Sequence, residues 1–128
     1  MPDTEKITIN MPAVDLGKID LLVQEGIFTN RTDFIRTAIR SQIDKHNVEI
    51  QQSVSRHSFG IGVISYSRSD LERHVIKGDK VSISIVGLLH LHNDISPELA
   101  VQAIESVQVR GIFKASDDVK AALTDRTK

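Results

Sequence analysis

Two histidines, His90 and His92, have the clearest capacity for chemistry in this chain. They stand two residues apart in an apolar run that predicts a β-strand, so both side chains lie on one face of that strand. Imidazoles are common transition-metal ligands, and the pair could share one ion. A complete site needs further ligands, for which His57 and His74 are the candidates. The interpretation that we adopt is two polar residues at a sheet edge or subunit interface, so we predict neither a metal site nor a cofactor.

No arrangement typical of a catalytic site is present. The chain has no cysteine, which removes disulfides, thiolate zinc sites and cysteine nucleophiles. No serine stands in a nucleophile elbow, and Gly60 and Gly62 lead into a strand pattern, so they do not form a phosphate-binding loop. Asp117 and Asp118 indicate a helix start, where acidic residues complement the helix dipole. We therefore predict that the protein is not an enzyme.

Length and composition are those of one folded domain, or of one domain with a small appendage. The 128 residues are 40% hydrophobic and 26% charged. Sixteen basic and 17 acidic residues give a net charge of −1, which excludes a broadly basic coat for nucleic acid but allows a local basic patch. No apolar run of about 18 residues and no secretory signal pattern are present, so we expect a cytoplasmic protein without a membrane partner.

The polar and apolar residues of positions 6–11 alternate, which predicts a strand with one buried and one exposed face. The apolar members are Ile7, Ile9 and Met11, and the polar members are Lys6, Thr8 and Asn10. A lone strand leaves its backbone groups unpaired. Either the C-terminal half supplies a neighbour, or two copies of the chain pair antiparallel into a ribbon with a dyad near its centre.

Two helices are expected to follow this strand. The first covers about residues 13–25 and ends at Gly26, a residue type typical of helix C-termini. Asn30, followed by Asp33 three residues later, forms an N-cap close to a capping box and starts the second helix.

This order of strand, helix, glycine turn and capped helix resembles the ribbon-helix-helix fold of the CopG, Arc and methionine repressor family. The segments that carry the resemblance are KITINMP, DLGKIDLLVQEG and NRTDFIRTAIRSQI, which together span about residues 5–45. The resemblance covers the N-terminal third of the chain only. It implies a homodimeric, sequence-specific DNA-binding transcriptional regulator, most simply a repressor, whose two-stranded ribbon enters the major groove of double-stranded DNA.

The resemblance also implies which residues contact DNA. The implied base-reading residues are Lys6, Thr8 and Asn10. Lysine can donate to guanine, asparagine can pair with adenine, and threonine can contact thymine. The implied phosphate-binding residues, at the start of the second helix, are Thr29, Asn30, Arg31 and Thr32. The alternatives are an ordinary solvated strand face and an Asn30 that serves only as a cap.

Charge limits the DNA affinity of this segment. Residues 1–50 hold six basic and eight acidic residues, a net charge of −2. Because phosphate contacts dominate affinity, we expect modest binding per dimer, with several dimers side by side on an operator.

We expect an α+β protein with three parts. Residues 1–47 form the ribbon-helix-helix domain, residues 48–57 form a helix tail and linker, and residues 58–128 form a small α/β domain for assembly or sensing. The last part contains strand patterns at 59–66, 81–91 and 107–113. Its predicted helix-capping serines are Ser67, Ser96 and Ser116.

Several alternatives remain open for the function. The protein could be an antitoxin with the same DNA module, or a structural protein that uses the ribbon only to dimerise. It could also be a metal-responsive regulator, because the nickel-responsive regulator likewise joins a ligand domain with a His-x-His strand to a ribbon-helix-helix. The absence of cysteine and the short C-terminal half count against that reading. The expected assembly is a homodimer, or a tetramer or larger.

Overall fold

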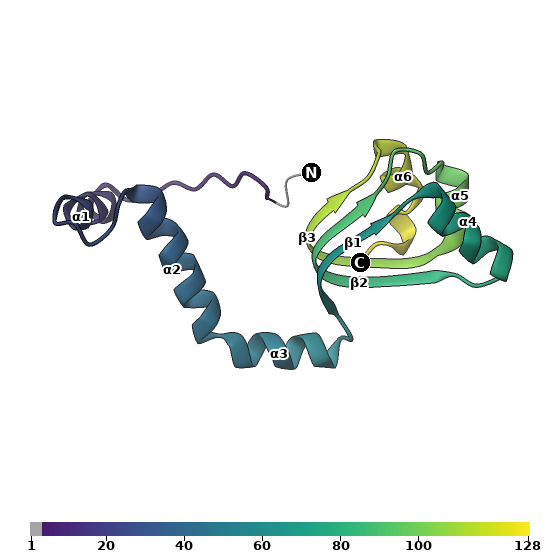
Figure 1. The fold of residues 1–128 in the computed structure, drawn as a ribbon, viewed down its shortest axis with the longest axis horizontal. Coiled ribbons are helices and arrows are strands. Elements are labelled where there is room, and N and C mark those ends of the chain that lie inside the picture. The colour runs from purple at the N-terminus through teal and green to yellow at the C-terminus, as the bar shows by residue number, and fades with distance from the viewer. Residues whose placement is uncertain (1–3) are drawn as a thin grey trace. The chain divides into compact units, whose positions relative to one another are not determined.

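The computed structural model describes residues 4–128, which divide into two compact units, Thr4–Arg56 and His57–Lys128 (Figure 1). The described chain combines helices with one three-stranded parallel sheet, which confirms the expected mixture of helix and strand. Among residues 4–128, no helix combines the length and apolar character needed to cross a membrane.

The unit Thr4–Arg56 contains helices α1 (Ala13–Gln24), α2 (Arg31–Lys45) and α3 (Asn47–Arg56). The first two begin and end close to the predicted positions. Gly26, two residues after the end of α1, has a φ of 79°, a backbone conformation that residues with a Cβ rarely adopt. Asn30 caps α2, since its side chain accepts a hydrogen bond from the backbone N–H of Asp33.

The stretch expected to be a helix tail and linker is a regular helix, α3. It contains neither glycine nor proline, so nothing in its residues interrupts helical hydrogen bonding. Ile50 and Val54, four residues apart and therefore on one side of the helix, are its half-buried apolar residues.

The segment before α1 forms no strand in the single chain, in contrast to the strand predicted for residues 6–11. Residues 4–12 are neither helix nor strand. Ile7 is 82% exposed and Ile9 is 67% exposed, so the predicted apolar face is uncovered. The sheet of the described residues consists of strands from the other unit alone. The C-terminal half therefore does not supply the missing neighbour, and the ribbon with a second chain stays a prediction.

The unit Thr4–Arg56 buries little apolar surface by itself. Ile19 is its one fully buried residue. Its exposed large apolar residues are Ile7, Ile9, Val14, Leu21, Ile27, Ile39, Ile43 and Val48. An apolar surface of this extent on a small unit is typical of a protein interface.

The unit His57–Lys128 alternates strands and helices. Its strands are β1 (Gly60–Tyr66), β2 (Val81–Leu91) and β3 (Ile104–Lys114). Its helices are α4 (Arg68–Lys77), α5 (Pro97–Ala103), α6 (Asp117–Ala122) and the short 3-10 helix η1 (Thr124–Arg126). The strands run parallel in the order β1-β2-β3. The third strand starts three residues earlier than predicted because α5 passes into it without a loop.

All three predicted serine caps are confirmed. The side chains of Ser67, Ser96 and Ser116 accept hydrogen bonds from the backbone N–H groups of Asp70, Leu99 and Val119. Ser67 and Asp70 also form a complete capping box, in which each side chain bonds to the other residue's backbone.

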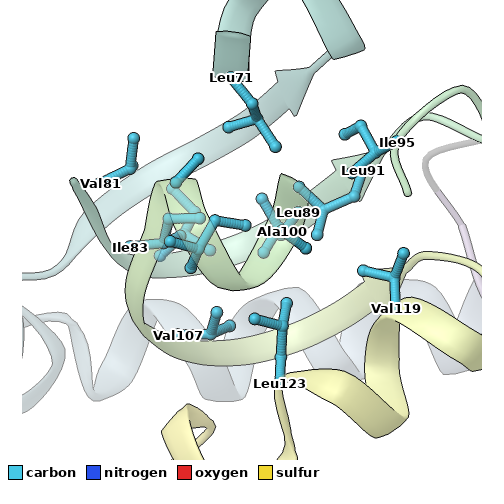
Figure 2. Packing of buried hydrophobic residues seen from close by; sticks show 13 residues of the cluster. Leu71, Val81, Ile83, Leu89, Leu91, Ile95, Ala100, Val107, Val119 and Leu123 are labelled. Atoms are coloured by element: carbon cyan, nitrogen blue, oxygen red, sulfur yellow. The ribbon is translucent and has the colours of Figure 1, made fainter. Parts of the chain in front are cut away.

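The hydrophobic core of this unit lies between one face of the sheet and its helices (Figure 2). The inward residues of β2, Ile83, Leu89 and Leu91, are at most 2% exposed. Leu71 from α4 and Leu123 beyond α6 complete the cluster and are fully buried. In Figure 1, α4, α5 and α6 gather on the same side of the strands.

The opposite face of the sheet lacks such a cover at β1. Ile61 is 60% exposed and Val63 is 56% exposed. The strand register sets Ile61 beside Val86, and Val63 beside Leu88 and then Ile112. We call this side of the sheet the open sheet face. Parallel sheets are normally covered on both faces, so this face is a second candidate interface.

Candidate nucleic-acid interface

The three residues expected to read DNA bases lie in the arm that precedes α1. Lys6, Thr8 and Asn10 are all exposed. None of their side chains forms a hydrogen bond or an ion pair within the described part of the chain. Alternation with Ile7 and Ile9 means that a strand formed here would carry the three polar groups on one face.

The start of α2 brings together the four residues expected to bind phosphate. The backbone N–H of Asp33 donates to Asn30 Oδ1 over 2.8 Å, and the backbone N–H of Thr29 donates to Asp33 Oδ2 over 2.9 Å. Asn30 is therefore a cap. The backbone N–H groups of Arg31 and Thr32 have no acceptor among residues 4–128, so the cap leaves them free to bind an anion.

The side chain of Arg31 is paired with a carboxylate that sequence reasoning missed. Arg31 Nε donates to Asp20 Oδ1 over 2.7 Å, and a terminal nitrogen of the same guanidinium donates to Asp20 Oδ2 over 2.8 Å. The hydrogen bond from Arg31 holds the pKa of Asp20 below its usual range, and the same bond raises the pKa of Arg31. Both side chains are about half exposed. Eleven residues separate them, so no local pattern signals the pair.

An apolar hollow of about 310 Å³ lies between the end of the arm and the two helices. Its apolar lining comes from Met11, Ile19, Leu22 and Phe34. The hollow belongs to the same unit as the exposed Ile7 and Ile9, so one chain offers both an apolar recess and apolar side chains that are not buried.

The histidine pair lies in the other unit, at the end of β2. The rings of His90 and His92 stack with their centroids 4.5 Å apart, in agreement with their predicted common face. A hydrogen bond of 2.7 Å joins Ser65 Oγ to His92 Nε2. Desolvation lowers the pKa of His90, and the neighbouring His92 and Lys114 add to this effect. A neutral imidazole is the form that binds metal.

The donor set around this pair does not make a complete metal site within one chain. Among residues 4–128, no group of three His, Asp or Glu residues is placed to hold a metal ion. His74 is paired with Asp79 at 2.9 Å, and the ring of His57 lies 6.0 Å from that of Phe59. His74 is thus paired with a carboxylate elsewhere, and among residues 4–128 neither candidate completes a ligand set with His90 and His92.

Comparison with known proteins gives consistent results. The model of the ribbon-helix-helix transcriptional regulator family matches residues 2–120. The resemblance expected for the N-terminal third alone therefore extends over most of the chain.

Three similar proteins carry the name of a regulator. A protein of Methanococcus aeolicus, named "Putative nickel-responsive regulator", is 31% identical over 128 residues, which cover 98% of this chain and 86% of that protein. A protein of Methanocaldococcus jannaschii with the same name is 30% identical over 127 residues, 97% of this chain and 85% of that protein. Transcriptional regulator CdrS of Halobacterium salinarum is 36% identical over 42 residues, 33% of this chain and 76% of that protein. No solved structure matches.

Proposed function

The chain belongs to the ribbon-helix-helix transcriptional regulator family, and from this premise we propose that it is a sequence-specific DNA-binding regulator, most simply a repressor, that acts as a homodimer. The family and the names of its relatives point to the regulation of transcription and away from catalysis.

The observation that carries the dimer is the exposed apolar face of the N-terminal arm. Two arms that pair antiparallel satisfy each other's backbone groups, and Ile7 and Ile9 of both chains then face the helices. Burial of one isoleucine side chain contributes about 2 kcal/mol, so four of them give a substantial driving force. The hollow lined by Met11, Leu22 and Phe34 supplies apolar surface for this contact.

The same pairing gives the polar residues their role. Lys6, Thr8 and Asn10 of both chains would lie together on the outer face of the ribbon, where their side chains can reach base edges in the major groove. The phosphate-binding residues at the start of α2 are Thr29, Asn30, Arg31 and Thr32, with the free N–H groups of Arg31 and Thr32 as the donors.

The unit His57–Lys128 provides the higher assembly in this proposal. Ile61 and Val63 on its open sheet face are more than half exposed, although parallel strands are normally covered on both sides. Pairing of two such faces would join two dimers into a tetramer.

The test of DNA recognition is retention of sheared genomic DNA on the purified protein, followed by sequencing. Wild type should enrich a few short inverted repeats, and the double variant Thr8→Ala, Asn10→Ala should not. A control with the same two substitution types outside the arm, Thr37→Ala with Asn47→Ala, should enrich the wild-type sites. Loss of enrichment in the control as well, or equal enrichment by all three proteins, would contradict base reading by the arm.

A metal-responsive regulator is the second candidate, favoured by the stacked pair His90 and His92 and by the names of the two nearly full-length relatives. One chain offers two clustered imidazoles, so a metal would need ligands from outside this cluster. Equilibrium dialysis with Ni²⁺ tests the idea. Binding that is lost in His90→Ala, His92→Ala but kept in the control His46→Ala, the one histidine outside the candidate ligand set, supports it. No binding by wild type, or equal binding by both variants, rejects it.

A further inference from the structure

We propose that Asp20 competes with DNA phosphate for Arg31, and so limits the sequence-independent part of DNA affinity. This inference rests on the proposed function, and it assigns a regulatory role to a residue that no part of the DNA-contact pattern includes.

The geometry of the pair shows why the two anions compete. Asp20 occupies two donor positions of the Arg31 guanidinium, at 2.7 Å and 2.8 Å. A phosphate accepts from the same planar fork of donors. Arg31 is the first residue of α2, next to the free N–H groups that would hold a phosphate. The guanidinium therefore cannot bind phosphate in this bidentate way while it is bound to Asp20.

The energetics allow a phosphate to replace Asp20 on Arg31, but they reduce the net gain in DNA affinity. The Arg31 side chain is 54% exposed and that of Asp20 is 50% exposed, and exposed ion pairs contribute little net stability. A phosphate can therefore displace the carboxylate. The displaced carboxylate then stands unpaired close to another anion, and this repulsion cancels part of the gain. Arg31 consequently adds less to DNA affinity than an unpaired arginine at the same position.

Contacts other than the ion pair also hold this region together. The turn between α1 and α2 is closed by backbone hydrogen bonds from the N–H of Gly26 to the Val23 carbonyl and from the N–H of Ile27 to the Leu22 carbonyl, both 3.0 Å. The rings of Phe28 and Phe34 also pack edge to face, with their centroids 5.0 Å apart.

As a consequence, phosphate contacts determine less of the DNA affinity and base contacts determine more of it. Residues 1–50 carry a net charge of −2, so each basic group has a large share of the phosphate contacts. With Arg31 held back, base contacts make up more of the total affinity, and random DNA is bound less tightly than the count of basic residues suggests.

The experiment is a double-mutant cycle on the full chain, with wild type, Asp20→Asn, Arg31→Ala and the double variant. Affinity for a short random-sequence duplex is measured at several salt concentrations from about 50 to 200 mM. Asp20→Asn should bind more tightly than wild type and lose affinity more steeply with salt. One added phosphate contact steepens that loss by about 3.5-fold over this range, and two contacts in a dimer by about 12-fold.

Two comparisons make the result decisive. In the Arg31→Ala background, Asp20→Asn should give a clearly smaller gain in affinity, because only the direct repulsion between the carboxylate and the phosphate is left to relieve. Asp44→Asn changes the net charge equally at the far end of α2, about 20 Å along the helix, and should leave the salt dependence at the wild-type value. Circular dichroism and thermal unfolding confirm that each variant is folded.

The outcomes separate this inference from the proposed function. If wild type binds random DNA and folded Asp20→Asn binds it no more tightly, the competition is wrong while DNA binding stands. An equal gain in the Arg31→Ala background or in Asp44→Asn would show a general charge effect and also overturn it. If wild type binds neither random nor genomic DNA under any salt condition, the proposed function itself fails, and the inference falls with it.

Discussion

Gly87 occupies a position in the sheet that no other residue can fill. Gly62, Gly87 and Gly111 stand side by side across β1, β2 and β3. Their φ angles are 138°, 142° and 130°. A Cβ on Gly87 would lie 2.0 Å from the carbonyl oxygen of Gly62, and a Cβ on Gly111 would lie 2.1 Å from that of Gly87. At Gly87 and Gly111 the positive φ and the collision with backbone both exclude a side chain, whereas at Gly62, which has open space around it, only the positive φ disfavours one.

Gly87→Ala should therefore destabilise the protein by about 3 kcal/mol or more. The matched control is Gly60→Ala in β1, where the added Cβ would lie 3.5 Å from Ile85 Cδ1 in ordinary contact. That change should alter stability by less than about 1 kcal/mol. Urea unfolding of the two full-length variants measures the difference, and similar midpoints for both would contradict this account of the glycine row.

At the scale of elements, the helix caps were predictable because their chemistry is local. Ser67, Ser96 and Ser116 each precede a helix by one residue, and all three accept the hydrogen bonds that the pattern predicts. Other features depend on partners distant in the sequence. The pair of Asp20 and Arg31 joins two helices, and the glycine row becomes visible only when three strands are in register.

The N-terminal arm is the opposite case. Its alternating pattern predicts a strand, and the single chain forms none there. In the proposed dimer, the partner that such a strand needs would come from the second chain. The alternation also predicts that Ile7 and Ile9 are buried, whereas both are exposed in the single chain.

The capping box of α4 predicts a pH dependence of stability. Asp70 Oδ2 accepts from the backbone N–H and from the hydroxyl of Ser67, at 2.8 Å and 2.9 Å. These hydrogen bonds hold the pKa of Asp70 below its usual range. A carboxyl whose pKa is lower in the folded state than in the unfolded state stabilises the fold fully at pH values above its unfolded-state pKa. That stabilisation is lost as the pH falls through its folded-state pKa.

The stability difference between wild type and Asp70→Ala should accordingly be largest at neutral pH and should shrink in acid. Thermal unfolding between neutral pH and strong acid measures it. A difference that is constant with pH, or that grows in acid, would show that the ionised carboxylate does not stabilise α4.

At the scale of the whole molecule, the boundary between the two units should be accessible to proteases. His57 and Ser58 are exposed, and Ser58 has an unusual positive φ of 55°. Limited trypsin treatment should cut after Arg56 and leave a protected fragment of residues 57–128, because that part has a buried core. Rapid loss of this fragment, identified by mass spectrometry, would instead favour the disordered tail of an antitoxin.

In the proposed dimer, two N-terminal arms pair antiparallel with a dyad near the middle of residues 6–11. The described chain has no cysteine, so a single introduced thiol reports on its own copy. Residues opposite each other in an antiparallel pair have Cα atoms about 4.5 to 5.5 Å apart, a distance that suits a disulfide.

The most direct test is therefore oxidation of Thr8→Cys in dilute solution without DNA, with Thr124→Cys in η1 as the control. If the arms pair, Thr8→Cys should convert almost completely to a covalent dimer on a non-reducing gel, while the control should stay as a single chain. Failure of Thr8→Cys to cross-link, in a folded protein that sediments as a monomer, would contradict the ribbon and the DNA-binding surface built on it.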